Sequence, residues 1–364
     1  MNGSICLKNK SQMKVFMIIK RLRYSGAYKM FMWVAKALAN RGHEVTVFTF
    51  MKNDVEELQP NIRWIKADLE HASIFRKVKE ARRWIKKTEA DISISFLLDA
   101  NIINTLACLG MKTKSVICER NDPYKPHYYK LKFTKSLFRL ADGAVFQLPK
   151  VAEYYSMVKR NTAVIPNPVI PTSAKIELKP FDKREDVIVS LGRYDIFQKR
   201  QDVLLHAFAR FLEDHPDYML EFYGDGPDED RIKKIVESLG ISDNVIIGGI
   251  TSHSAQVLSK SKFFVLSSDF EGIPNALMEA MSIGLPCIST RCRPGGAEYL
   301  IEDGVNGLLV DTSNFEEMYK AMNRIAETGV ADSLGREAKR VTERFSEKRI
   351  SNMWCEYIKN FQEH

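Results

Sequence analysis

Short β-branched runs alternate regularly with longer amphipathic stretches along this sequence, and this alternation limits the folds open to it. In the stretch 28–42, the apolar residues Met30, Val34 and Leu38 recur at helical spacing and Gly42 closes the segment. Strand–helix–strand units of this kind predict parallel sheets with helices on both faces. Twelve runs are predicted to be strands, six in each half of the chain: 15–20, 44–50, 91–97, 114–119, 143–148 and 162–167, then 186–193, 218–224, 244–249, 262–268, 285–290 and 307–311.

The length of the chain, 364 residues, predicts two domains rather than a single core. The segment 166–186 lies between the two sets of strands. It is rich in proline and lysine and lacks periodicity, so it is interpreted as a linker. We therefore expect an α/β protein with two facing, doubly wound Rossmann-like domains. Ligands of such sheets bind at the carboxyl ends of the strands, and the cleft between the two domains is the expected site.

The charge is distributed unevenly along the chain. Residues 1–172 carry 30 Lys and Arg against 14 Asp and Glu, whereas residues 173–364 carry 24 against 32. The basic half favours an anionic partner, and nucleic acid, an anionic membrane surface and a phosphorylated lipid all fit. A merely basic surface is the alternative. No apolar run has the about 18 residues of a membrane span, no signal peptide is evident, and residues 1–12 are interpreted as a tail.

The stretch EGIPNALMEA contains two glutamates eight positions apart, Glu271 and Glu279. Pro274 suits the first turn of a helix, so Glu271 is placed on the loop after a strand and Glu279 inside the helix. The N–H groups of Asn275 and Ala276 then lie at the positive end of the helix, where anions bind. Carboxylates accept hydrogen bonds and suit vicinal hydroxyls. The pattern predicts two hydroxyl-binding acids beside an anion site, although such a spacing also occurs by chance.

A second motif, SLGRYDIFQKRQD, places Arg193 and Lys199 on the loop after the strand 186–193. A fork-shaped guanidinium and a mobile ammonium together suit a diphosphate, whose charge they would neutralise as it departs. A solvated loop without a ligand is the alternative for this motif.

Three further loops follow predicted strands. Gly226 lies in the turn FYGDGP and Ile250 ends the segment GGI, and both are interpreted as backbone positions near a nucleobase. Gly26, in RLRYSGAYKM, would let the backbone approach a phosphate. This loop is not GxGxxG, which argues against a dinucleotide oxidoreductase. The acids at 228–230 are expected to cap a helix rather than to hold a metal.

The order of GRYDIFQKRQD, YGDGP, DFEGIPNALMEAMSIGLPCIST and GGAEYLIEDGVNGLLV resembles that of the retaining glycosyltransferases of family 4, especially bacterial enzymes that build capsule, exopolysaccharide or lipopolysaccharide O-antigen repeats. The resemblance covers most of 13–345. It implies the GT-B fold with the active site in the interdomain cleft. Residues 1–172 plus 345–364 would form the N-terminal acceptor-binding domain and residues 173–344 the C-terminal nucleotide-sugar-binding domain.

The resemblance also implies roles by position. Arg193 and Lys199 would hold the donor diphosphate, and Glu271 would contact the transferred sugar. These three residues are the candidate catalytic residues, while Glu279 would bind the ribose. The remaining candidate donor-binding positions are Gly26, Gly226, Ile250, Gly272, Ile273, Pro274, Asn275 and Ala276.

Two loops depart from the family pattern. The first-domain loop often reads Gly-Gly-Ala-Glu, but here Tyr28 replaces the acid. The loop after the fourth strand often carries histidine, but CERNDP places Arg120 there, followed by Asn121 and Asp122. Arg120 and Asp122 are therefore candidate acceptor-side residues, and a structural pair between them is the alternative.

The resemblance and the motifs together predict a retaining, metal-independent hexosyltransferase without a cofactor. It would move a hexose or N-acetylhexosamine from a nucleotide sugar, UDP-linked by family habit, to a glycan or polyprenyl-diphosphate-linked acceptor. No nucleophile is evident, so the protein would act by electrostatics and positioning in a same-face reaction. A cytoplasmic chain, peripheral on the anionic inner face of the cell membrane, is expected.

The alternatives are a nucleotide-sugar epimerase of the same fold and a basic nucleic-acid-binding protein. The basic half lacks the interleaved aromatic residues on which bases stack, so no nucleic-acid partner is expected.

Overall fold

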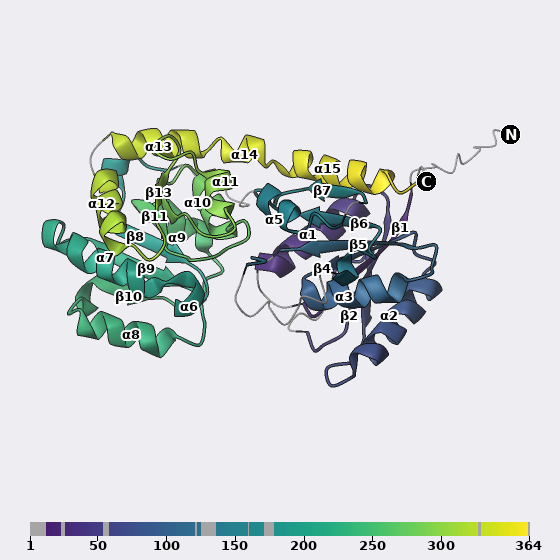
Figure 1. Ribbon diagram of the computed structural model, residues 1–364. Coiled ribbons are helices and arrows are strands. Elements are labelled where there is room, and N and C mark those ends of the chain that lie inside the picture. Colours follow the sequence, from purple (N-terminus) through teal and green to yellow (C-terminus); the bar gives the residue numbers. More distant parts are fainter. Residues whose placement is uncertain are drawn as a thin grey trace. The chain divides into compact units, whose positions relative to one another are not determined.

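The computed structural model describes residues 12–22, 26–53, 58–120, 122–124, 136–158, 160–170, 178–326 and 329–362 (Figure 1). The expected tail, up to residue 11, as well as Ser25 and Asn121, lie outside the described residues. The chain forms two compact units: the first comprises Met1–Pro166 and Lys348–His364, and the second comprises Asn167–Glu347. In the described ranges, no helix is both long enough and apolar enough to cross a membrane.

The first unit is built on a seven-stranded sheet in the order β3-β2-β1-β4-β5-β6-β7, and every pairing is parallel. The order reverses between β1 and β4. The strands are β1 Lys14–Ile19, β2 Glu44–Thr49, β3 Ile62–Lys66, β4 Ile92–Phe96, β5 Lys114–Glu119, β6 Gly143–Phe146 and β7 Thr162–Val164. The helices are α1 Gly26–Ala39, α2 Ile74–Lys87, α3 Leu98–Cys108, α5 Pro149–Tyr154 and α15 Glu347–Lys359.

Helices cover both faces of this sheet, because alternate strand residues point to opposite sides. Phe16 and Ile18 of β1 are buried in one cluster with α2 and α3. At the end of β4, Phe96 meets α1 through the edge of the Phe31 ring, with centroids 5.2 Å apart, and Trp354 of α15 stacks on it at 6.3 Å. The last helix therefore completes the core of the first unit, although the chain has already passed through the second.

The second unit has a six-stranded parallel sheet in the order β10-β9-β8-β11-β12-β13, which reverses between β8 and β11. Its strands are β8 Val187–Leu191, β9 Met219–Tyr223, β10 Val245–Ile247, β11 Phe263–Leu266, β12 Cys287–Thr290 and β13 Leu308–Val310. Its helices are α6 Ile196–Lys199, α7 Gln201–Asp214, α8 Glu229–Ser238, α9 Ser254–Lys260, α10 Asn275–Ser282, α11 Gly296–Leu300, α12 Phe315–Ala326, α13 Val330–Ala338 and α14 Val341–Arg344, with short 3-10 turns η2 Phe181–Lys183 and η3 Ser242–Asn244. Helices α7, α8, α12 and α13 share one core with the strands.

These two parallel-sheet α/β units confirm the predicted fold class, and each of the twelve predicted strands corresponds to an observed strand. The prediction missed β3, Ile62–Lys66. This strand lies at the edge of its sheet, and only Ile62 and Ile65 of its residues are buried. Arg63 and Lys66 are exposed, so the segment lacks the apolar run by which the central strands were found.

The structural units divide at Pro166 and at Glu347, whereas the sequence placed these boundaries at 172 and 344. The difference arises because the amide of Val169 donates to the backbone oxygen of Phe345 at 2.8 Å and Val169 forms a parallel bridge with Ser346. These two segments, far apart in sequence, therefore stay with the second unit.

Candidate functional site

The candidate site lies at the carboxyl edge of the second unit's sheet, at the point where the strand order reverses. The chain leaves β8 and β11 in opposite directions there, which is where doubly wound sheets bind ligands. Lys199, at the end of α6, contacts Glu271, on the loop after β11, through Nζ and Oε1. The hydroxyl of Ser268 donates to the same Glu271 oxygen at 3.0 Å. The structure thus joins two predicted site residues that are 72 positions apart in sequence.

Local structure explains the position of Lys199. Helix α6 is a single turn, and its start is capped by Asp195, whose carboxylate accepts a hydrogen bond from the amide of Gln198 at 3.2 Å. The aliphatic part of Lys199 then lies over Gly192, where a Cβ would be 3.4 Å from the lysine Cε. The Lys199 and Glu271 side chains are only 19% and 12% exposed. The ion pair is therefore held in a sheltered position rather than on an open surface.

Arg193, the third candidate catalytic residue, differs from Lys199 in its exposure and in its side-chain contacts. Its side chain is exposed, and within the described part of the chain its guanidinium has neither a hydrogen bond nor an ion pair. Its backbone oxygen accepts a hydrogen bond from the Gln201 side chain at 2.8 Å, which fixes the loop beneath it. The guanidinium is thus available to a ligand while its backbone is held.

Helix α10 begins at Asn275 and Pro274 is its N-cap residue, so the helix starts one residue after the position expected from the sequence. The Asn275 side-chain oxygen accepts a hydrogen bond from Asn167 at 2.7 Å. Glu279 lies one turn inside the helix, half-buried, and accepts from the Ser254 hydroxyl of α9 at 2.5 Å. The two glutamates therefore have separate partners, in agreement with their predicted placement on a loop and on a helix.

The glycine-rich loops at this edge are packed backbone against backbone. A Cβ at Gly226 would overlap the backbone of Tyr194, and one at Gly296 would overlap the backbone oxygen of Gly272. These contacts hold the loop after β8 against the loop after β9, and α11 against the loop of Glu271. Gly272 is half-buried and Ile273 is buried, whereas Ile250, after β10, is 77% exposed.

The other predicted positions belong to the first unit. Gly26 is exposed at the start of α1, while Arg120 and Asp122 follow β5 and are buried. The Arg120 guanidinium lies over the Phe96 ring, 4.6 Å from its centroid, and burial lowers the pKa of Arg120. Asp122 accepts a hydrogen bond from the amide of Tyr124 at 2.9 Å. Their role on the acceptor side stays a prediction.

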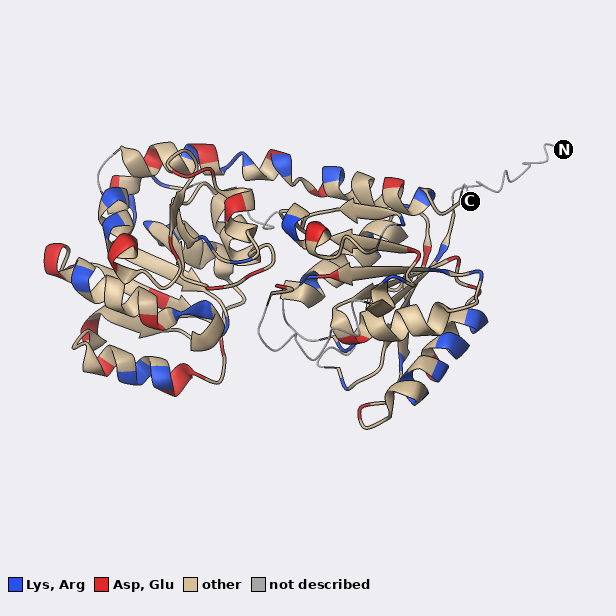
Figure 2. Ribbon diagram, viewed as in Figure 1, with Lys and Arg blue, Asp and Glu red and all other residues tan. Residues whose placement is uncertain are grey.

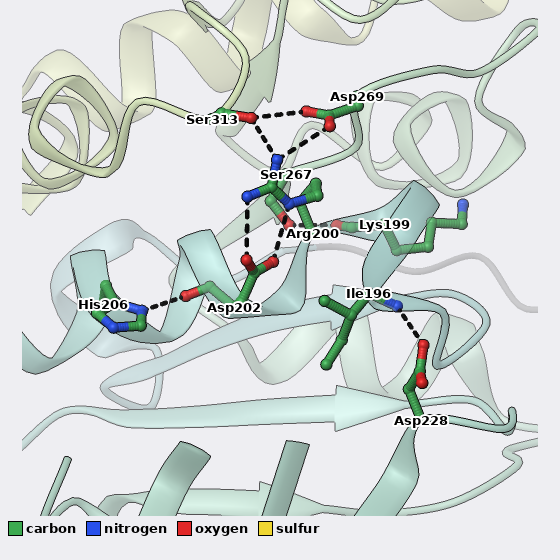
Figure 3. Close-up of polar contacts among 9 residues, drawn as sticks. All are labelled: Ile196, Lys199, Arg200, Asp202, His206, Asp228, Ser267, Asp269 and Ser313. Carbon is green, nitrogen blue, oxygen red and sulfur yellow. Dashed lines mark hydrogen bonds and ion pairs between the residues drawn. The ribbon is translucent and has the colours of Figure 1, made fainter. Parts of the chain in front are cut away.

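Arg200, the residue after Lys199, and its partner Asp269 were not among the residues predicted from the sequence. Figure 3 shows the Arg200 guanidinium between Asp202 and Asp269, with the Lys199 side chain directed away from it. The run Lys-Arg-Gln-Asp at 199–202 signalled a charged turn, but which of its two cations meets Glu271 depends on the fold. Among the described residues, no group of three or more His, Cys, Asp or Glu side chains could hold a metal ion.

Comparison with solved structures identifies the fold. The crystal structure of Anabaena HepE in complex with UDP and glucose superposes with a TM-score of 0.79 over 95% of this chain and 99% of that one, at 20% sequence identity. Two doubly wound parallel sheets with this likeness define a protein of the GT-B fold.

Two family models then match consecutive parts of the sequence. Glycosyltransferase Family 4 matches residues 24–172 and Glycosyl transferases group 1 matches residues 173–342. The chain therefore belongs to the family 4 glycosyltransferases, and the resemblance seen in the motifs is confirmed.

Two curated relatives show the range of the match. An uncharacterized glycosyltransferase of Methanocaldococcus jannaschii is 27% identical over 252 residues, which is 62% of this chain and 62% of that protein. The match thus spans less than two thirds of that relative's length. A Campylobacter jejuni α-1,4-N-acetyl-D-galactosaminyltransferase, named for an undecaprenol-diphosphate-linked acceptor, is 28% identical over 95% of this chain and 98% of its own.

Proposed function

We propose that this chain moves a hexose or N-acetylhexosamine from a nucleotide sugar to a glycan or polyprenyl-diphosphate-linked acceptor in the synthesis of a bacterial surface polysaccharide. The preferred donor in this proposal is a UDP-linked sugar. The observation that carries the proposal is the Lys199–Glu271 pair at the strand-order reversal of the second sheet. The UDP and glucose named with Anabaena HepE and the lipid-linked acceptor named with the Campylobacter enzyme support the two substrate classes.

The charges around this pair suit a nucleotide sugar, which has an anionic centre and hydroxyl-rich ends. Lys199 and the exposed Arg193 would bind the diphosphate, because an ammonium and a guanidinium together neutralise it. The first N–H groups of α10 would add donors at the positive end of a helix. Glu271 would then accept hydrogen bonds from the transferred sugar and Glu279 from the ribose.

We further propose that the reaction retains the anomeric configuration and needs no metal ion. The two cations would stabilise the departing diphosphate, and a phosphate oxygen would take the proton of the acceptor hydroxyl on the same face of the sugar. The protein would contribute charge and position rather than a covalent intermediate. Proton NMR of the product, from reactions with and without EDTA, tests both points, and an inverted anomeric centre or a loss of turnover with EDTA would contradict them.

The transfer itself is tested by incubating the protein with a panel of nucleotide sugars and glycan or polyprenyl-diphosphate acceptors. The proposal predicts a nucleoside diphosphate and an extended acceptor in equal amounts, formed only when both substrates are present. A sugar isomerised without an acceptor would instead show an epimerase, and no reaction with any donor would contradict the proposal.

The two glutamates are expected to affect different kinetic constants. Glu279→Ala should raise the dissociation constant of the donor about 10-fold, because it removes hydrogen bonds to a charged group, with little effect on kcat. Glu271→Ala should mainly lower kcat, by about 100-fold, because its sugar contact is expected to strengthen in the transition state. Calorimetric titration with donor and steady-state kinetics separate the two effects, and equal changes in both constants for both variants would refute the division of roles.

We also propose that the first unit binds the anionic inner face of the cell membrane, through α2. Seven of the 14 residues of this helix are Lys or Arg, against one acid, and only two are buried (Figure 2). Phe75, Lys79, Arg83 and Lys86 are exposed and share one face at helical spacing, and the Phe75 side chain is 83% exposed. A basic helix face with a projecting aromatic ring suits the surface of an anionic bilayer.

Neutralising Lys79, Arg83 and Lys86 with glutamine should weaken binding to vesicles of anionic phospholipid about 100-fold, since each cation near such a surface contributes about 1 kcal/mol. Sedimentation with vesicles at low salt measures this. The matched control neutralises Arg231, Lys233 and Lys234 on α8, which are also exposed, and should retain binding. Equal losses in both triple variants would assign binding to net charge instead of to α2.

A further inference from the structure

Arg200 occupies an unusual backbone conformation at the junction of α6 and α7. Its φ of 49° and ψ of 45° place it in the left-handed region, which disfavours any residue with a Cβ. Its amide still donates to the backbone oxygen of Ile196 at 3.2 Å, so the turn is closed in spite of the side chain. Glycine would suit this conformation better. The contacts of the side chain therefore have to explain why position 200 is an arginine.

The guanidinium joins three separate segments of the second unit (Figure 3). Its Nε and Nη2 donate to the two carboxylate oxygens of Asp202, in the first turn of α7, at 3.0 Å each. Its Nη1 donates to Asp269, on the loop after β11, at 3.0 Å, and to the hydroxyl of Ser313, after β13. Ser313 in turn donates to Asp269 at 3.2 Å. The hydrogen bonds that the guanidinium donates to Asp202 and Asp269 raise the pKa of Arg200, so it stays charged.

This network lies directly beside the Lys199–Glu271 pair. Arg200 follows Lys199, and Asp269 precedes Glu271 by two residues, so two adjacent ion pairs join the same two segments. The backbone reinforces them, because the amide of Asp269 donates to the backbone oxygen of Gln198 at 2.9 Å. In the proposed function, Lys199 binds the donor diphosphate, and its ion pair with Glu271 is then broken. Of the two ion pairs, Arg200–Asp269 is the one that would persist, beside the backbone bond and the bonds from Gln198 to Phe270 and from Ser267 to Lys199.

We infer that Arg200 is a positioning residue: it holds the loop that carries Glu271 against the turn that carries Lys199, so that Glu271 keeps its place when the donor engages the lysine. This inference deepens the proposed function and rests on it for the catalytic consequence. The structural part, an ordered loop, can be measured without any substrate.

The test uses Arg200→Gly, which removes the guanidinium and at the same time relieves the left-handed backbone, so the chain should still fold. We expect kcat for transfer to fall about 10- to 100-fold, because a small misplacement of a contacting group is costly, while the donor KM changes less than about threefold. Guanidinium ion, added far below denaturing concentrations, should restore part of kcat in this variant. Arg200→Lys should recover little, because an ammonium cannot bridge Asp202 and Asp269.

Two further variants define the specificity of the effect. Asp269→Asn should also lower kcat, but guanidinium ion should not rescue it. Arg210→Ala removes an arginine inside α7 and its half-exposed ion pair with Glu316, 3.1 Å long, and should leave kcat unchanged. If Arg200→Gly keeps a wild-type kcat, or if its loss of kcat does not respond to guanidinium ion, the positioning role is refuted.

Hydrogen–deuterium exchange of the donor-free protein supplies a readout that does not depend on transfer. The amides of Asp269 and Glu271 are both hydrogen-bonded, to the backbone oxygens of Gln198 and Arg293. Their peptide should exchange faster in Arg200→Gly than in the wild type, and unchanged exchange would overturn the inference. If the wild type transfers no sugar, the proposed function fails, while the exchange result still decides whether Arg200 orders the loop.

Discussion

Lys199→Ala is expected to lower kcat for sugar transfer about 100- to 1000-fold, the range found when one preorganised donor to a developing negative charge is removed. The lysine ammonium would contact the diphosphate as its negative charge grows, and its sheltered position means that water cannot fully replace it. Steady-state kinetics with saturating donor measure the loss.

The decrease in kcat must be distinguished from a decrease in stability, because Lys199→Ala also leaves the largely buried Glu271 without its cation. Lys199→Met keeps the packing over Gly192 and should be as inactive as the alanine variant while melting closer to the wild type. The control is Lys233→Ala on α8, which breaks an exposed pair with Glu229 and should not alter kcat. A Lys199→Met variant with near-wild-type kcat would contradict the proposed role of the ammonium.

Gly296→Ala should strongly lower turnover, although Gly296 is not one of the proposed donor-binding residues. A Cβ at Gly296 would overlap the backbone oxygen of Gly272, and backbone atoms cannot rotate aside as a side chain can. The loop between Glu271 and α10 must therefore shift. Overpacking of this kind costs about 1–3 kcal/mol of stability. A displacement of about 1 Å in a positioning segment lowers turnover about 100-fold. Chemical denaturation and kinetics on the same preparation measure both.

The matched control is Gly240→Ala, at the end of α8, where a Cβ would meet no atom within 4 Å but the φ of 69° is unfavourable for alanine. This variant should lose about 1 kcal/mol of stability through backbone strain alone and keep its kcat. If Gly296→Ala and Gly240→Ala lose stability and activity in the same proportion, the loop of Gly272 does not have the positional role assigned to it.

The sequence contained most of the fold because its strands are central and apolar. The run 114–119 is fully recovered as β5, and the other central strands differ from their predicted bounds by at most two residues at either end. The edge strand β3 was not predicted from the sequence. Two of its five residues are exposed cations, which obscure the alternation of apolar and polar residues. Propensity and periodicity identify segments that are buried on both faces far better than segments that are half solvated.

The site was predictable as a set of loops but not as a set of contacts. Glu271 and Glu279 could be placed on a loop and a helix from Pro274 and the preceding strand. That Glu279 would accept a hydrogen bond from Ser254 depends on how α9 packs against α10, which local sequence does not encode. The Arg200 network was missed for the same reason, since two of its three partners lie 69 and 113 positions further along the chain.

In the proposed function, the second unit binds a nucleotide sugar through Lys199 and Arg193. The most direct test is a thermal-shift titration of the full chain with a panel of nucleotide sugars, because a ligand that binds only the folded state raises the melting temperature by mass action. We expect at least one nucleotide sugar, and its nucleoside diphosphate, to raise the melting temperature of the wild type and of Lys233→Ala. We expect a clearly smaller rise for Arg193→Ala and Lys199→Met. A wild type stabilised by none of them, or variants stabilised as much as the wild type, would contradict the proposal.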